Sequence, residues 1–139
     1  MTPFLETAMS TPLTPSTSAR PRVLITGGGA GIGAAAALRC HSDGYDPVII
    51  DRQIDQVPAC FKAIQADLSS AEDTARALAL ALEDGPITRL VNNVGIVVPN
   101  DAASQTLAEF DLAVSLNLRC AFQCMQALLP GMQAAQFGR

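Results

Sequence analysis

The chain has 139 residues, of which 49% are hydrophobic and 16% charged, and its formal net charge is −4 at pH 7. This length indicates one domain with enough apolar residues for a core. The acidic balance excludes the basic footprint of a protein that binds nucleic acid or an anionic membrane, and no run approaches the ~18 consecutive apolar residues of a membrane span.

Residues 1–21 differ in composition from the rest of the chain. They are rich in Thr, Ser and Pro, show no periodicity, and lack the basic start and apolar block of a secretory signal. We therefore predict a disordered extension over residues 1–21, followed by one α/β domain over residues 22–139.

Apolar runs and helical patterns predict seven elements in chain order. They are a strand (22–26), a helix (about 31–42), two strands (47–51 and 61–66), a helix (70–83), a strand (87–91) and a long helix (about 106–133). Right-handed crossovers between parallel strands then predict the order 3-2-1-4, which is half of a Rossmann-type doubly wound sheet.

Local signals set the predicted helix ends. Ser69 with Glu72, and Thr106 with Glu109, have the spacing of a capping box. Pro130 lacks a backbone N–H and is expected to kink or end the long helix. The two capping boxes mark the starts of two helices, and the proline marks a kink or an end in the long helix.

Residues Thr26–Gly33 read T-G-G-G-A-G-I-G, between a buried strand and an alanine-rich helix. Such a turn directs bare N–H groups at a helix N-terminus, where an anion is favoured, and glycine lets the backbone approach a pyrophosphate. A glycine-rich turn without a ligand is the alternative from these residues alone. The candidate cofactor-binding residues of the turn are Thr26, Gly27, Gly29, Ala30, Gly31, Ile32 and Gly33.

Asp51 ends the second predicted strand, at the distance where a dinucleotide site expects an acidic residue. Its carboxylate would accept hydrogen bonds from the adenosine ribose hydroxyls and repel a 2′-phosphate, which favours NAD. Arg52 is the usual type of partner for a 2′-phosphate, so NADP stays possible. Asp51 and Arg52 are therefore both candidate cofactor-binding residues.

Small polar residues also follow the other two strands. Asp67 and Leu68 follow the third strand, and Asn92-Asn93-Val94-Gly95 follows the fourth. Ligands bind outside the carboxyl ends of the strands of a parallel sheet. Asp67, Leu68, Asn93, Val94 and Gly95 are therefore added to the candidate cofactor-binding residues.

Taken together, these motifs resemble the short-chain dehydrogenase/reductase family from Arg22 to Arg139. The glycine spacing resembles its dehydrogenase-type cofactor turn, the segment 92–95 is similar to its N-N-A-G motif, and Asp67-Leu68 resembles its adenine-contacting pair. Asn117 falls where the family keeps the asparagine of its catalytic tetrad. The resemblance implies NAD(P), hydride transfer between nicotinamide and a small carbonyl or alcohol, and a homo-oligomer built partly on the long helix.

The tyrosine and lysine of that tetrad have no counterpart in this sequence. Tyr45 is the single tyrosine, the position four residues later is Ile49, and Lys62 is the single lysine. Carbonyl reduction needs an acid to protonate the developing alkoxide, and Asn117 cannot supply that proton. We expect the chain to be an N-terminal cofactor-binding part that stops before the catalytic serine and the Y-x-x-x-K pair, and to be inactive alone.

Two functional hypotheses are consistent with all of these motifs. The first is the cofactor half of an NAD(P)-dependent alcohol dehydrogenase or ketoreductase, and the second is a non-catalytic dinucleotide-binding remnant or truncated gene product. An epimerase or dehydratase of the same superfamily is disfavoured, because the glycines at 27, 31 and 33 have the shorter dehydrogenase spacing.

The cysteines and the sheet edge give the remaining expectations. The four cysteines follow no metal spacing, so no metal site is predicted, and they fit a reducing cytoplasm. Cys120 and Cys124 are expected to be packed thiols on one helix face. The outer edge of strand 87–91 is expected to be bare and open to pairing with other chains.

Overall fold

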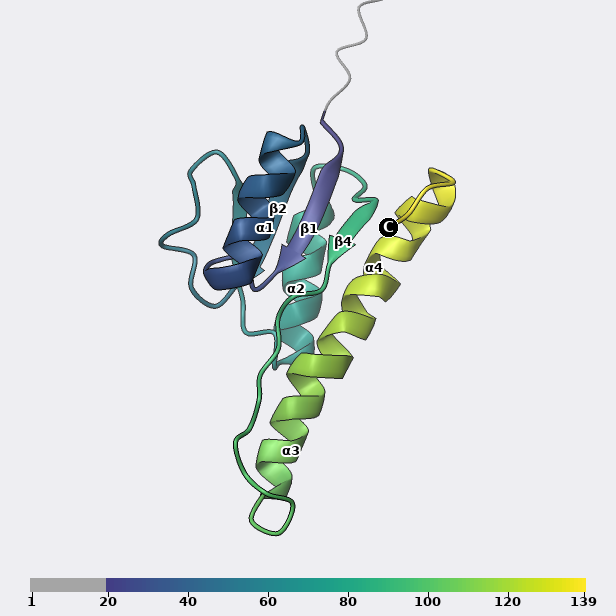
Figure 1. The fold of residues 1–139 in the computed structure, drawn as a ribbon. Coiled ribbons are helices and arrows are strands. Elements are labelled where there is room, and N and C mark those ends of the chain that lie inside the picture. Colours follow the sequence, from purple (N-terminus) through teal and green to yellow (C-terminus); the bar gives the residue numbers. More distant parts are fainter. Residues whose placement is uncertain (1–19) are drawn as a thin grey trace, which may run out of the picture.

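The computed structural model describes residues 20–139, so the predicted extension over residues 1–21 lies almost entirely outside the described residues. One parallel sheet, with its strands in the order β3-β2-β1-β4, is covered by helices on both faces (Figure 1). The predicted α/β Rossmann-type sheet and its strand order are confirmed. The elements are β1 (Arg22–Thr26), α1 (Gly31–Ser42), β2 (Asp46–Asp51), β3 (Lys62–Gln65), α2 (Ala71–Leu82), β4 (Arg89–Val91), α3 (Leu107–Val114), a π-helical turn η1 (Ser115–Arg119) and α4 (Cys120–Ala134).

The two central strands are buried on both faces, which explains their unbroken apolar runs. Val23 and Ile25 of β1 pack toward α1, whereas Leu24 packs toward α2 and α4. Alternate residues of β2 divide in the same way, with Ile49 on the α1 side and Val48 on the other. Because successive side chains of a strand point to opposite faces of the sheet, the same strands contribute to two separate cores.

Helix α1 ends in a backbone cap at Gly44. Gly44 has φ +89°, its N–H donates to the His41 carbonyl, and the Tyr45 N–H donates to the Cys40 carbonyl. This is the hydrogen-bond pattern of a Schellman motif, in which glycine takes the left-handed position.

The N-terminus of α2 differs by one residue from the prediction. Ser70 is the N-cap, and its side chain accepts a hydrogen bond from the Asp73 N–H. The predicted Ser69–Glu72 box is wrong because the Ser69 hydroxyl donates to Asp67 instead. The predicted box of Thr106 and the first turn of α3 is confirmed with both of its bonds.

The long helical segment α3-η1-α4 runs beside the sheet (Figure 1). Pro130 lies inside α4, which continues to Ala134, so the proline does not end the helix. Packing holds this turn: Leu128 is 1% exposed, and Gly131 lies so close to Pro86 that an added Cβ would be 3.2 Å from it. Cys120 and Cys124 are buried as free thiols, as expected.

The same segment, Leu107–Ala134, is 28 residues long with a mean hydropathy of 1.2 in its most apolar window, and 22% of that window is buried. By length and composition alone it could cross a membrane, but the core helix of a soluble domain has the same properties. Cys124 and Leu128 do pack in the core. The segment also presents exposed apolar side chains, among them Leu107, Phe110, Leu118, Phe122, Met125 and Leu129.

The outer edge of β4 is not bare, which corrects the prediction. The Arg139 N–H donates to the Thr88 carbonyl, and the Leu90 N–H donates to the Arg139 carbonyl. The Arg89 guanidinium lies 4.5 Å from the centre of the Phe137 ring. The chain after α4 therefore turns back and pairs with β4, because an apolar strand edge leaves backbone groups that require partners.

Candidate dinucleotide-binding site

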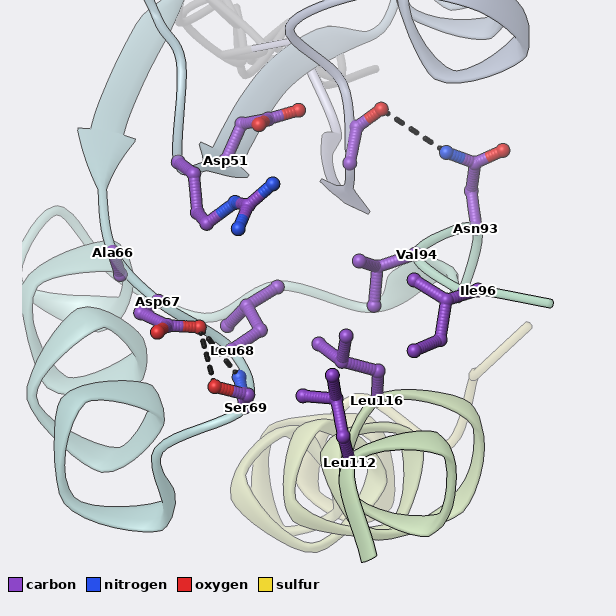
Figure 2. Close-up of a pocket in the computed structure, with 13 residues that line it drawn as sticks. Asp51, Ala66, Asp67, Leu68, Ser69, Asn93, Val94, Ile96, Leu112 and Leu116 are labelled. Atoms are coloured by element: carbon purple, nitrogen blue, oxygen red, sulfur yellow. Dashed lines mark hydrogen bonds between the residues drawn. The ribbon is translucent and has the colours of Figure 1, made fainter. Parts of the chain in front are cut away.

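A pocket of about 310 Å³ lies at the carboxyl ends of the strands. Residues that follow all four strands line it, together with Leu112 of α3 and Leu116 of η1. Figure 2 shows Asp51, Asp67 and Asn93 around this common space, with the two leucines closing one side. The fold thus brings together residues that are up to about 90 positions apart in the sequence, as expected for the ligand-binding edge of a doubly wound sheet.

The turn after β1 is held to the end of β4 by a reciprocal brace. The Asn93 side-chain amide donates to the carbonyls of Thr26 and Gly27, at 3.0 Å each. The Thr26 hydroxyl accepts from the Asn93 N–H at 3.1 Å and from the Val94 N–H at 3.2 Å. Thr26 is fully buried, so it positions the turn and does not face the pocket.

Glycine is required at several places in this turn, and Gly27 and Gly33 illustrate the reason. Gly27 has φ +68°, and an added Cβ would lie 2.9 Å from the Asn93 amide nitrogen. A Cβ on Gly33 would lie 2.1 Å from the Gly27 carbonyl oxygen, so the first turn of α1 could not approach the strand end. These close contacts explain the spacing of the glycines by packing.

The N-terminus of α1 is open. Its N-cap, Ala30, provides no side-chain hydrogen bond, and its first turn holds no acidic residue. A Cβ added to Gly31 would meet nothing within 4 Å, and Ile32 is 82% exposed. The free N–H groups and the positive end of the helix dipole are therefore accessible to an anion.

Asp51 and Arg52 lie beside this turn at the end of β2. The Asp51 carboxylate accepts from the Gly29 N–H at 2.8 Å and from the Gln53 N–H at 3.0 Å. The Arg52 carbonyl accepts from the Gln65 side chain of β3. The acidic side chain predicted for the ribose is thus fastened to the glycine turn, with a guanidinium next to it.

Asp67 and Leu68 follow β3 and differ in their surroundings. The Ser69 hydroxyl and N–H both donate to Asp67 Oδ1, at 2.7 Å and 2.9 Å. These bonds stabilise the ionised form and lower the pKa of the Asp67 carboxyl. Leu68 is 3% exposed and lines the pocket from the core. The pair therefore presents an acceptor next to an apolar floor.

Asn117 lies in η1, and both ends of its amide contact one residue. Its Oδ1 accepts from the Ile96 N–H at 2.8 Å, and its Nδ2 donates to the Ile96 carbonyl at 2.9 Å. Gly95 has no room for a side chain, because a Cβ would be 2.8 Å from Asn117 Oδ1. The predicted catalytic asparagine thus anchors the loop after β4.

Five lining residues were not among the predicted site residues: Ala66, Ser69, Ile96, Leu112 and Leu116. Ser69 had a signal in the sequence, because Asp67 two positions before it is the pattern of an Asx turn. Leu112 and Leu116 are four apart on one helical face, which marks a shared face but not the pocket it closes. Ile96 is held in place by its two hydrogen bonds with Asn117.

The single tyrosine and the single lysine lie away from this pocket. Tyr45 precedes β2 and contacts Arg89 at the amino side of the sheet. Lys62 at the start of β3 donates to the Leu80 carbonyl and to Asp84. Within residues 20–139 no group of three or more His, Cys, Asp or Glu side chains could hold a metal ion.

Comparisons with known proteins agree with this geometry. The sequence profile of the short chain dehydrogenases matches residues 21–139. The chain belongs to the short-chain dehydrogenase/reductase family. Homologues in this family are oxidoreductases: the chain is 31% identical over 118 residues to the 3-oxoacyl-[acyl-carrier-protein] reductase MabA of Mycobacterium tuberculosis, covering 84% of this chain and 47% of the relative.

Two solved structures extend the similarity. The bulky-bulky ketone specific alcohol dehydrogenase of Comamonas testosteroni superposes with a TM-score of 0.77 at 27% identity, covering 85% of this chain and 51% of that one. A short-chain dehydrogenase from Sphingobium yanoikuyae in complex with NADPH has a TM-score of 0.77 at 29% identity, with the same coverage. The chain therefore spans about half the length of the family members it matches.

Proposed function

We propose that this chain binds a nicotinamide dinucleotide and forms the cofactor-binding part of an oxidoreductase that transfers hydride between nicotinamide and a carbonyl or alcohol. The observation that carries the proposal is the open N-terminus of α1 beside this pocket: Gly27 of the same turn lines the pocket with Asp51 and Asp67, and the Gly29 N–H donates to Asp51. Bare N–H groups suit the pyrophosphate, and the two carboxylates suit ribose hydroxyls and an adenine amino group. The NADPH complex of the Sphingobium relative supports a cofactor of this class.

We further propose that NAD is preferred to NADP. The Asp51 carboxylate is held at the glycine turn by two N–H donors, so a 2′-phosphate placed there would meet a fixed negative charge. Arg52 lines the same pocket and would favour that phosphate, which keeps NADP as the alternative. The two neighbouring side chains thus act in opposite directions on the same 2′ position.

Fluorescence titration of the 139-residue chain with NADH and NADPH tests both proposals. NADH should bind at least about tenfold more tightly than NADPH, and Asp51→Ser should narrow or reverse that ratio. Asp46→Ser is the matched control, because it removes the same charge from the opposite end of β2. Absence of saturable binding to either dinucleotide would contradict the proposed function, and an unchanged ratio in Asp51→Ser would contradict only the role of Asp51.

The reaction itself requires an acid that this sequence lacks. We therefore propose that the chain alone does not turn over, either as the cofactor part of a reductase or as a non-catalytic dinucleotide-binding protein. NADH consumption above a buffer blank, over a broad carbonyl panel, would contradict this. A reducing cytoplasmic location stays a prediction, and the absence of disulfides among the four described cysteines is compatible with it.

A further inference from the structure

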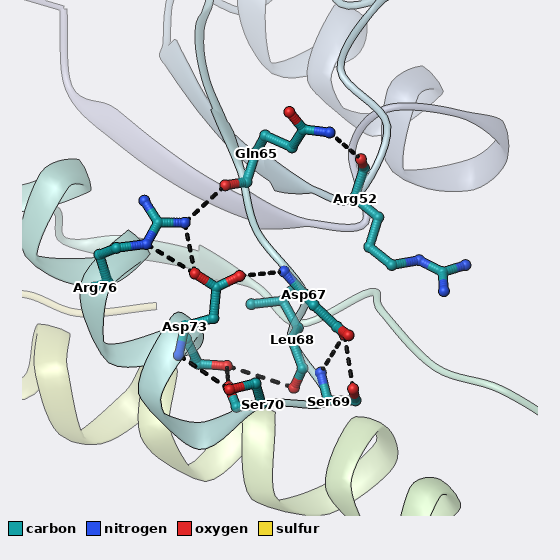
Figure 3. Close-up of polar contacts among 9 residues, drawn as sticks. Arg52, Gln65, Asp67, Leu68, Ser69, Ser70, Asp73 and Arg76 are labelled. Atoms are coloured by element: carbon teal, nitrogen blue, oxygen red, sulfur yellow. Dashed lines mark hydrogen bonds and ion pairs between the residues drawn. The ribbon is translucent and has the colours of Figure 1, made fainter.

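The first turn of α2 lies against the segment that follows β3 (Figure 3). Asp73 Oδ2 accepts from the Asp67 N–H at 2.7 Å. Asp73 Oδ1 forms an ion pair with Arg76, at 2.8 Å from Nε and 2.6 Å from a terminal guanidinium nitrogen. The same guanidinium donates to the Gln65 carbonyl at 3.0 Å. The Asp73–Arg76 ion pair of the helix therefore hydrogen-bonds to the backbone on both sides of Ala66.

These bonds are made to backbone groups, so they fix the path of the chain where the pocket begins. Ala66 between them is 3% exposed and lines the pocket. The next side chain is Asp67, whose Oδ1 is oriented by the two Ser69 donors. The adjacent Gln65 side chain donates to the Arg52 carbonyl at 2.9 Å, which joins the same segment to the end of β2.

Capping of α2 does not account for the Asp73 carboxylate. The cap bond of this helix runs from the Asp73 backbone N–H to the Ser70 hydroxyl. An acidic side chain in the first turn also interacts favourably with the helix dipole, but exposed Glu72 supplies that effect equally. What distinguishes Asp73 from Glu72 is its contact with the backbone of Asp67.

We propose that Asp73 and Arg76 are positioning residues for adenine recognition: they hold residues 65–67 so that the Asp67 carboxylate meets the exocyclic amino group of the adenine. This inference rests on the proposed dinucleotide binding. The chemistry is that of a carboxylate acceptor and an amino donor, whose hydrogen bond depends on distance and direction. A shift of the Asp67 backbone would weaken that bond and leave the pyrophosphate contacts of the glycine turn in place.

The test compares NADH with reduced nicotinamide hypoxanthine dinucleotide, which carries an oxo group where adenine has its amino group. We would measure the Kd of both dinucleotides by fluorescence for the wild-type chain and for Asp73→Ala, Asp73→Asn and Glu72→Ala. Asp73→Ala should raise the Kd for NADH about 3- to 10-fold and leave the Kd for the hypoxanthine analogue unchanged. Asp73→Asn retains an acceptor for the Asp67 N–H and should show a smaller rise, and Glu72→Ala should show none.

The outcomes separate the inference from the proposed function. An equal rise of both Kd values in Asp73→Ala would show a merely structural role and overturn the inference, as would no rise in either. If Asp73→Ala loses its circular dichroism signal, Asp73→Asn and Arg76→Lys decide by the same comparison. If the wild-type chain binds neither dinucleotide, the proposed function is itself contradicted and this inference is overturned with it.

Discussion

At the scale of single residues, Thr26 illustrates how a position can serve the site without touching a ligand. Its buried hydroxyl accepts two backbone N–H groups from the end of β4, 67 and 68 positions away in the sequence. A buried donor that loses its acceptor costs about 1–3 kcal/mol. The hydroxyl is therefore a structural link between the glycine turn and the last strand.

Thr26→Val should lower the free energy of unfolding by about 2 kcal/mol, because it keeps the shape of the side chain and removes the acceptor of both N–H groups. Urea denaturation followed by circular dichroism measures the change. Thr26→Ser is the control, since it keeps the hydroxyl and loses only a methyl group. Equal losses in the two variants would show that packing, and not the hydroxyl, makes the contribution.

At the scale of elements, the π-helical turn η1 joins the long helix to the loop after β4. A π turn widens the helix locally and often occurs at functional sites. Here it carries Asn117, whose amide satisfies both backbone groups of Ile96. The helix therefore positions the loop that borders the pocket. Among the described residues, Asn117 is the one hydrogen-bond partner of the Ile96 backbone N–H and carbonyl.

Asn117→Ala should raise the amide hydrogen-exchange rate of Ile96 about 3- to 10-fold, because the loop loses two hydrogen bonds to the helix. Exchange followed by NMR measures the rate, with the core amides of β1 as an internal reference. Leu118→Ala, next to it on the same turn and 66% exposed, is the control and should leave the rate unchanged. Unchanged exchange in Asn117→Ala would exclude the anchoring role.

At the scale of the whole molecule, one apolar helical face is left exposed in the described structure. Leu118, Phe122, Met125 and Leu129 follow one another at helical spacing along η1 and α4, and each is at least half exposed. A contiguous apolar surface of this kind is typical of an interaction site. We propose that it supports the homo-oligomer that the family resemblance implies.

Phe122→Lys should weaken self-association by at least about tenfold, because it places a charge in the middle of the apolar face. Sedimentation velocity over a range of concentrations measures the effect against the 14.5 kDa monomer. Leu38→Lys is the matched control, as it changes an exposed leucine on α1, which covers the other face of the sheet. A wild-type chain that stays monomeric at all concentrations would refute the proposal.

The sequence by itself determined the order of elements, the parallel sheet and the location of the glycine turn. These features depend on local patterns: buried runs such as Val48–Ile50, a glycine that tolerates positive φ at Gly44, and the capping box at Thr106. Each pattern encodes hydrogen bonds and burial within a few residues of itself, so no distant contact is needed to interpret it.

Only the tertiary structure decided how those pieces are joined. Ser70 replaced Ser69 as a cap because Asp67 took the Ser69 hydroxyl, and α4 passed through Pro130 because its neighbours pack on Pro86. Arg139 covered the edge of β4, and Asp73 reached back to the chain after β3. These outcomes are competitions between partners for the same donors, acceptors and space, and only the folded chain sets which partners lie within reach.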